Sequence, residues 1–225
     1  MRLSAFLHDH SVLLVFLFAT TFVFFWLLPF RKRLRINTII VLLLSFLSVL
    51  TGFLSLIMFA WLEGIGNPNA SGGYSLFGSV FFMPITFWLG AKITKRDVSS
   101  VFDILTIPMI VALLCARMNC LLTGCCVGLP ISGTNGLHWP TREMELVYDL
   151  VFIFYFAPKV LKGRTKGEVY PWYMLSYGVV RFVLETFRYS DAGTMFHLSH
   201  FWAIISFCIG LTFVIEMRET KKRRK

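Results

Sequence analysis

The chain has 225 residues, of which 56% are hydrophobic and only 15% are charged. A soluble domain averages roughly 45–50% apolar and about 25% charged residues, so the composition excludes an ordinary soluble protein. The 24 phenylalanines and 6 tryptophans exclude a disordered chain, because such chains are poor in aromatic residues. The formal net charge of +10 could indicate a nucleic-acid partner, but the positions of the basic residues argue against one.

Seven apolar stretches are long enough to cross a bilayer, which takes about 20 residues in a helix. They lie near 11–30, 37–61, 74–91, 101–122, 143–161, 169–188 and 197–216. The first is too long for a signal-peptide core and has no small-residue cleavage site after it, so we expect a retained helix. The sequence therefore predicts an all-α, polytopic integral membrane protein, with seven transmembrane helices in a single bundle over 1–225.

Seventeen of the 22 lysines and arginines form four clusters, which follow the first, third, fifth and seventh stretches. The clusters lie at 31–35, 92–96, 159–166 and 218–225. Cytoplasmic segments of membrane proteins carry an excess of Lys and Arg. The clusters therefore predict an N-out, C-in topology with a basic cytoplasmic tail at 218–225, and they explain the positive charge without a nucleic acid.

Ionised side chains inside the apolar stretches are candidates for function, because each costs about 2.5–3.5 kcal/mol at the centre of a membrane helix. These residues are Asp103, Arg117, Glu145, Asp149, Arg181, Glu185 and Arg188. Asp103 and Glu145 are expected near helix ends, where water or headgroups could solvate them. Arg117 and Arg181 have no such explanation.

The sixth stretch carries a polar stripe, because Tyr177, Arg181, Glu185 and Arg188 are spaced i, i+4, i+8 and i+11. One interpretation is structural, with Arg181 and Glu185 neutralising each other. The stripe, however, has two guanidiniums for one carboxylate. A spare buried arginine favours a phosphate or carboxylate from a ligand, whose oxygens match its planar fork.

A second segment, A-R-M-N-C-L-L-T-G-C-C-V-G-L-P at 116–130, contains Arg117 at a helix end, followed by Gly124 and Gly128. Its glycines would allow a re-entrant loop whose N–H groups bind an anion, or they form a plain connection outside the membrane. The five cysteines have no His or carboxylate at ligand spacing, so we expect no metal site.

Together these segments resemble the prolipoprotein diacylglyceryl transferase family, as a divergent member with a G-C-C form. The family pattern Y-G-x-x-R-F-x-x-E-x-x-R is matched in full at 177–188, in the sixth apolar stretch. G-G-Y-S-L-F-G at 72–78 and W-P-T-R-E-M-E at 139–145 also align. The family places a His, regarded as important for catalysis, where this chain has Phe77. The family has another His at the position of Trp139, and in this chain His138 lies one residue earlier.

The resemblance implies a transferase of the bacterial inner membrane. It would move the diacylglyceryl group of phosphatidylglycerol to the lipobox cysteine of prolipoprotein signal peptides, without a cofactor. The implied catalytic residues are Arg117, Arg181 and Glu185. The implied substrate-binding residues are Tyr177, Gly124, Gly128, Arg188, Glu145 and His138. Glu145 and His138 are also the candidates for a general base.

Two alternatives remain at this point. One is a related phospholipid-dependent transferase with another acceptor. The other is a transporter or scaffold in which the Arg–Glu stripe is structural. A transporter often has helices broken at corresponding places in two repeats, and we expect Pro84 and Pro108 to interrupt the third and fourth helices without counterparts in the sixth and seventh.

Overall fold

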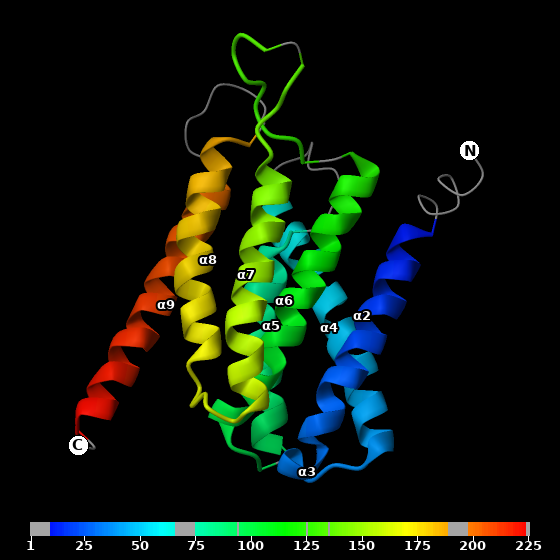
Figure 1. The fold of residues 1–225 in the computed structure, drawn as a ribbon, viewed down its shortest axis with the longest axis vertical. Helices are drawn as coiled ribbons and strands as arrows, with labels where there is room; N and C mark the ends of the chain where they lie inside the picture. The colour runs from blue at the N-terminus through cyan, green and yellow to red at the C-terminus, as the bar shows by residue number, and fades with distance from the viewer. Residues whose placement is uncertain are drawn as a thin grey trace.

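The computed structural model describes residues 10–65, 75–93, 95–124, 126–134, 136–188 and 198–223. Within these ranges the chain forms a helical bundle (Figure 1). Its only bridge-type pairings are two isolated ones, one inside the segment between α6 and α7 and one from that segment to Arg188 after α8. The long helices are α2 (Ser11–Leu27), α4 (Thr38–Gly64), α5 (Phe77–Ile93), α6 (Val98–Thr123), α7 (Thr141–Leu161), α8 (Val169–Thr186) and α9 (Leu198–Arg223). A short 3₁₀ segment, η1 (Leu28–Phe30), and α3 (Arg31–Leu34) continue α2.

Four helical stretches are long and apolar enough to cross a membrane, among the described residues. They are Val12–Leu34, Thr38–Gly64, Val98–Thr123 and Leu198–Thr220. Large apolar side chains also cover the outside of the bundle, such as Phe154 at 76% exposure and Ile39 at 69%. Such a surface is compatible with lipid rather than with water. The protein is therefore an all-helical, multi-pass membrane protein.

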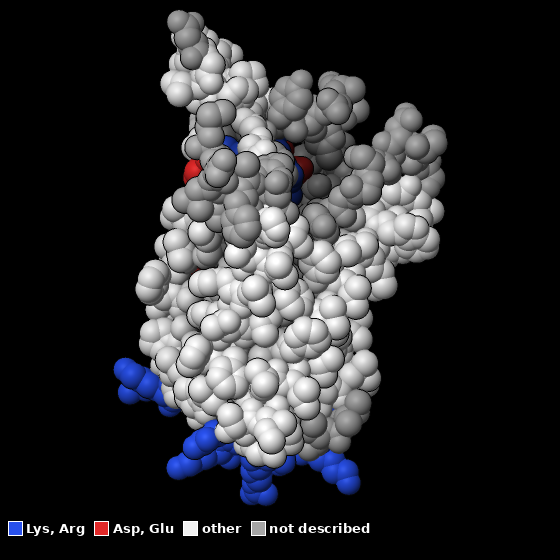
Figure 2. All heavy atoms as spheres, turned by 90° about the vertical axis from the view of Figure 1, so that its right-hand side faces the viewer, with Lys and Arg blue, Asp and Glu red and all other residues white. Residues whose placement is uncertain are grey.

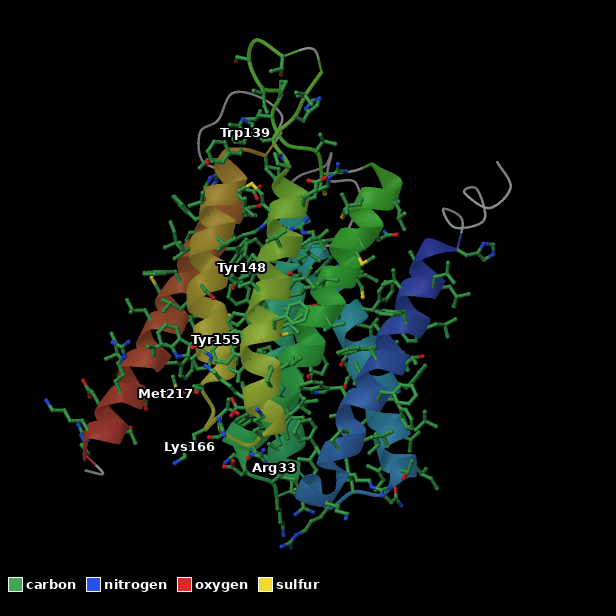
Figure 3. The ribbon with its side chains drawn as sticks, in the orientation of Figure 1. Arg33, Trp139, Tyr148, Tyr155, Lys166 and Met217 are labelled. Carbon is green, nitrogen blue, oxygen red and sulfur yellow. The ribbon has the colours of Figure 1, made fainter. Side chains whose placement is uncertain are left out.

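The basic clusters gather at one end of the bundle. Arg33 and Lys166 lie at this end, and Trp139 lies at the opposite end (Figure 3). On the face shown in Figure 2, lysines and arginines project from the same end, while the flanks are almost free of charge. Side chains also cap the helices that start here, since Asn37 accepts a hydrogen bond from Ile40 N and Asp97 accepts one from Ser100 N.

Pro84 and Pro108 lie inside continuous helices, so the prediction that they interrupt α5 and α6 is wrong. A proline has no N–H and leaves the carbonyl four residues earlier without its helical donor. Aromatic side chains replace both donors. The Tyr170 hydroxyl donates to Val80 O at 2.8 Å, and the Trp26 indole donates to Ile104 O at 2.8 Å. The prolines thereby connect α5 to α8 and α6 to α2.

Helices α8 and α9 approach each other closely because glycine lies at both crossing points. A Cβ on Gly178 would collide with Ala203 O and Phe207 N, and one on Gly210 would collide with Leu175 N. Small residues allow this kind of backbone contact between membrane helices. The contact fixes α8, which carries the polar stripe, against the C-terminal helix.

We expect Tyr170→Phe to lower the free energy of unfolding by about 1–3 kcal/mol, because it leaves the buried Val80 carbonyl without a donor. Thermal unfolding in detergent measures the change. Tyr155→Phe is the matched control, since Tyr155 is 60% exposed on the outside of the bundle and should lose almost nothing. Equal midpoints for the two variants would contradict the role of the Tyr170 hydroxyl.

Candidate functional site

Glu145 is the centre of a buried charge network near the end of the bundle that Trp139 marks. It lies one turn into α7 and is 2% exposed. Arg117 Nη2, from α6, contacts its two carboxylate oxygens at 2.7 and 2.9 Å. Arg181 Nη1, from α8, donates to its Oε2 at 3.2 Å. One carboxylate therefore connects three helices.

The network continues along α8 with alternating charge. Arg181 Nη2 lies 2.9 Å from Glu185 Oε2, and Arg188 Nη1 lies 3.5 Å from the same oxygen. The other terminal nitrogen of Arg188 donates to Cys126 Sγ at 2.9 Å. In total three guanidiniums face two carboxylates, so the network keeps an excess positive charge.

Several polar atoms of the network have no hydrogen-bond partner in the described part of the chain. They include three donors, the Nε atoms of Arg117 and Arg181 and the hydroxyl of Tyr177. Tyr177 is 1% exposed and stacks on Tyr173, with ring centroids 5.3 Å apart. The Arg181 guanidinium lies 5.6 Å from the centre of the Phe77 ring, a cation–π distance. Buried donors without partners are compatible with a ligand that supplies acceptors.

A cavity of about 430 Å³ adjoins the network. At one end it is lined by the arginines of the network, Arg117, Arg181 and Arg188. Most of its other lining residues are apolar and come from α2, α4, α5 and α6, and Leu105 of α6 is among them. Arg117 and Leu105 are twelve residues apart on α6, which corresponds to about 18 Å along the helix axis. The cavity thus has a cationic head and a long apolar body.

The arginines and the carboxylates occupy different positions relative to this cavity. The three arginines line it, whereas Glu145, Glu185 and Tyr177 do not. The carboxylates contact the arginines without lining the cavity themselves. The charged groups that border the cavity near the network are therefore mainly cationic.

The structure corrects two expectations about these residues. Glu145 is buried, not solvated by water or headgroups at a helix end. It also gives Arg181 a second carboxylate from within the protein. Arg117 adds a third guanidinium at the same time, so the excess of one positive charge is unchanged. Sequence spacing could not give this contact, because Glu145 and Arg181 are on different helices.

The segment between α6 and α7 does not enter the bundle. It projects beyond the helix ends (Figure 1), with Gly128 paired to Arg188 and Pro130 to His138. Gly124 ends α6 with φ +71° and is exposed, while a Cβ on Gly128 would collide with Trp139 O. His138 Nδ1 lies 2.9 Å from Gly128 O. The re-entrant loop is therefore a wrong alternative, and neither these glycines nor His138 lines the cavity.

Two parts of the sequence motifs lie outside the described residues. They are residues 72–74 of G-G-Y-S-L-F-G and Cys125. Phe77, the position of the family His, lies inside the cavity lining and is 2% exposed. Three or more His, Cys, Asp or Glu side chains that could share a metal ion are not found together among the described residues.

The sequence interpretation missed Glu63, which also lines the cavity. It lies in the last turn of α4, two residues beyond the end of the apolar stretch at 37–61. A signal was present, because a carboxylate in the last turn of a very apolar helix is as unusual as one in its middle. The apolar stretch was taken to end at residue 61, so Glu63 was not counted among the ionised side chains within it.

The fold and the site define a multi-pass membrane protein with an arginine-lined, amphipathic cavity. The chain belongs to the prolipoprotein diacylglyceryl transferase family, whose model matches residues 16–216. It is 26% identical over 178 residues to a phosphatidylglycerol–prolipoprotein diacylglyceryl transferase of Clostridium tetani, an alignment that covers 72% of this chain and 69% of the relative. It is 22% identical over 170 residues to a second such protein, of Clostridium perfringens, covering 68% and 66%.

We expect Glu145→Gln to lower the free energy of unfolding by about 3–5 kcal/mol, because it leaves two buried guanidiniums without their shared carboxylate. Chemical unfolding in detergent measures the change. Glu143→Gln is the matched control from the same helix, since Glu143 is 45% exposed and its pair with Arg142 is worth about 0–1 kcal/mol. Similar stabilities of the two variants would show that Glu145 does not hold the network together.

Proposed function

We propose that this chain transfers the diacylglyceryl group of phosphatidylglycerol to the lipobox cysteine thiol of prolipoproteins. The family supports the class of reaction, and lipoprotein diacylglyceryl transfer is the activity named for both relatives. The observation that carries the proposal for this chain is the cavity, where three arginines face a long apolar chamber. Such a chamber matches an anionic phospholipid in both charge and shape.

The reaction requires stabilisation of a phosphate leaving group. The thiolate sulfur displaces the phosphate at the glycerol carbon, and negative charge grows on the phosphate oxygens. Guanidinium donors held in a water-poor site stabilise this charge, so they stabilise the transition state more than the ground state. That difference is the condition for catalysis. Arg117 and Arg181 are the proposed phosphate clamp. Glu145 and Glu185 hold both guanidiniums in place before the substrate arrives.

The other proposed site residues act around this clamp. Tyr177 has a buried hydroxyl without a described partner, and this hydroxyl would donate to the phosphate after a small shift. Arg188, with 23% side-chain exposure, is the most accessible arginine of the three and suits the glycerol headgroup. Gly124, Gly128 and His138 would act indirectly, by shaping the segment that places Cys126 at the cavity.

The apolar part of the cavity would hold the acyl chains. Its walls extend about 18 Å below Arg117, the length of roughly three helical turns. They include Val23 of α2 and Phe87 of α5. A phosphate bound at the arginines would place the first part of each acyl chain against these walls.

We expect Arg181→Lys to reduce transfer at least tenfold and up to about a thousandfold, because a point charge cannot reproduce the bidentate fork and loses a donor in the transition state. The assay follows labelled diacylglyceryl from phosphatidylglycerol to a lipobox peptide in detergent. Arg223→Lys is the control, since Arg223 is 84% exposed on α9. Parental turnover of a folded Arg181→Lys protein would indicate that the stripe is structural.

The proposed topology has seven crossings of the bacterial inner membrane, with the N-terminus outside, the tail at 218–225 in the cytoplasm and 1–225 forming one bundle. The gathering of the basic clusters at one end supports this orientation. The arginine-lined end then faces the outer leaflet, where signal peptides present their cysteine.

Cysteines introduced into a cysteine-free variant test the topology. We expect Gly133→Cys to react with an impermeant maleimide in intact cells, and Lys95→Cys, Arg164→Cys and Lys222→Cys to react only after lysis. Labelling of Arg164→Cys in intact cells would contradict the proposed orientation and indicate the opposite one.

A further inference from the structure

Glu63 differs from the other carboxylates near the arginines. It is the only acidic residue among the described residues that line the cavity, and no described histidine lines it. It lies one residue before the end of α4 and lines the same cavity as the three arginines. A group at this position meets both the bound lipid and any acceptor that arrives from the outer face.

The contacts of Glu63 leave its carboxylate available. Glu145 and Glu185 each contact two arginines, whereas Glu63 has no ion pair within 4 Å in the described part of the chain. The side chains of Ser75 and Trp202 lie beside it. The charged groups that act on it from the neighbouring helix α8 are Arg181, which favours its ionised form, and Glu185, which opposes it.

The proposed transfer needs a proton acceptor that the rest of the cavity does not supply. The nucleophile is a thiolate, and a cysteine thiol with a pKa of about 8.5 is mostly protonated at pH 7. Glu145 is engaged by two guanidiniums outside the cavity lining, and His138 lies beyond the helix ends, bonded to Gly128 O. Phe77 occupies a lining position with a ring that cannot accept a proton.

We propose that Glu63 is the proton acceptor for the acceptor thiol, an inference that rests on the proposed function. The thiol proton passes to the Glu63 carboxylate and later to water at the outer face. The sulfur forms a bond to the glycerol carbon while the bond from that carbon to the phosphate oxygen breaks. The electron pair leaves with glycerol phosphate, and nothing is oxidised or reduced.

The test compares Glu63→Gln with the parent in the lipobox-peptide assay between pH 7 and 9. At pH 7 we expect kcat to fall about 10²–10⁴-fold, the usual contribution of a general base, with the KM for phosphatidylglycerol unchanged. As pH rises, the free thiol ionises without help, so the deficit should shrink by about tenfold or more. Glu219→Gln, from the 64%-exposed Glu219 of α9, is the control and should follow the parent at every pH.

Glu63→Asp keeps a carboxylate and provides a second variant if the amide variant does not fold. It should retain part of the activity with the pH profile of the parent. Parental turnover of a folded Glu63→Gln protein, a deficit that does not change with pH, or a Glu63→Asp protein with no turnover would each overturn the role of Glu63. If the parent itself transferred nothing, the proposed function would fall first, and the role of Glu63 with it.

Discussion

The structure depends on one buried carboxylate, Glu145, and the two guanidiniums it holds. Arg117 and Arg181 come from the helices on either side of α7, and Glu145 is the carboxylate that both of them contact. Burying an ion pair costs several kcal/mol per ion in lost hydration, and only good geometry and further hydrogen bonds offset that cost. Three apolar side chains of similar size would have packed these helices at a lower cost in free energy. The desolvation cost of these charges is explained by the proposed role of Arg117 and Arg181 in binding the lipid phosphate.

The network separates two tasks that a single residue cannot perform. The carboxylates, which do not line the cavity, hold the arginines, and the guanidiniums line the cavity. A site that holds its donors in position before the substrate binds does not reorganise during the reaction, and electrostatic catalysis depends on that property. Further hydrogen bonds join α7 to α8, between Tyr148 and Ser176 and from the Tyr173 hydroxyl to Asp149. Tyr148 lies nearer the middle of the bundle than Trp139 (Figure 3).

The sequence predicted the helices well and their polar contacts poorly, for different physical reasons. A membrane helix is a local property, because length and hydropathy over about 20 residues decide it. The partner of a buried charge depends on how helices pack, so the spacing on α8 revealed the Arg181–Glu185 pair but not Glu145. Proline gave a similar error. Pro84 and Pro108 were expected to interrupt their helices, but Tyr170 and Trp26, far away in sequence, replace the missing donors.

The order of charges along the chain has a consequence for biogenesis. Membrane helices leave the ribosome in sequence, and Arg117 on α6 is made before any of its partners. The next helix brings Glu145, and α8 with the residues just after it then brings Arg181, Glu185 and Arg188 in alternating sign. Each newly synthesised helix therefore carries the counterion of an earlier one, and insertion of α7 and α8 relieves the penalty left by α6. The translation order is also an assembly order, so the cavity acquires its cationic head only as the last helices integrate.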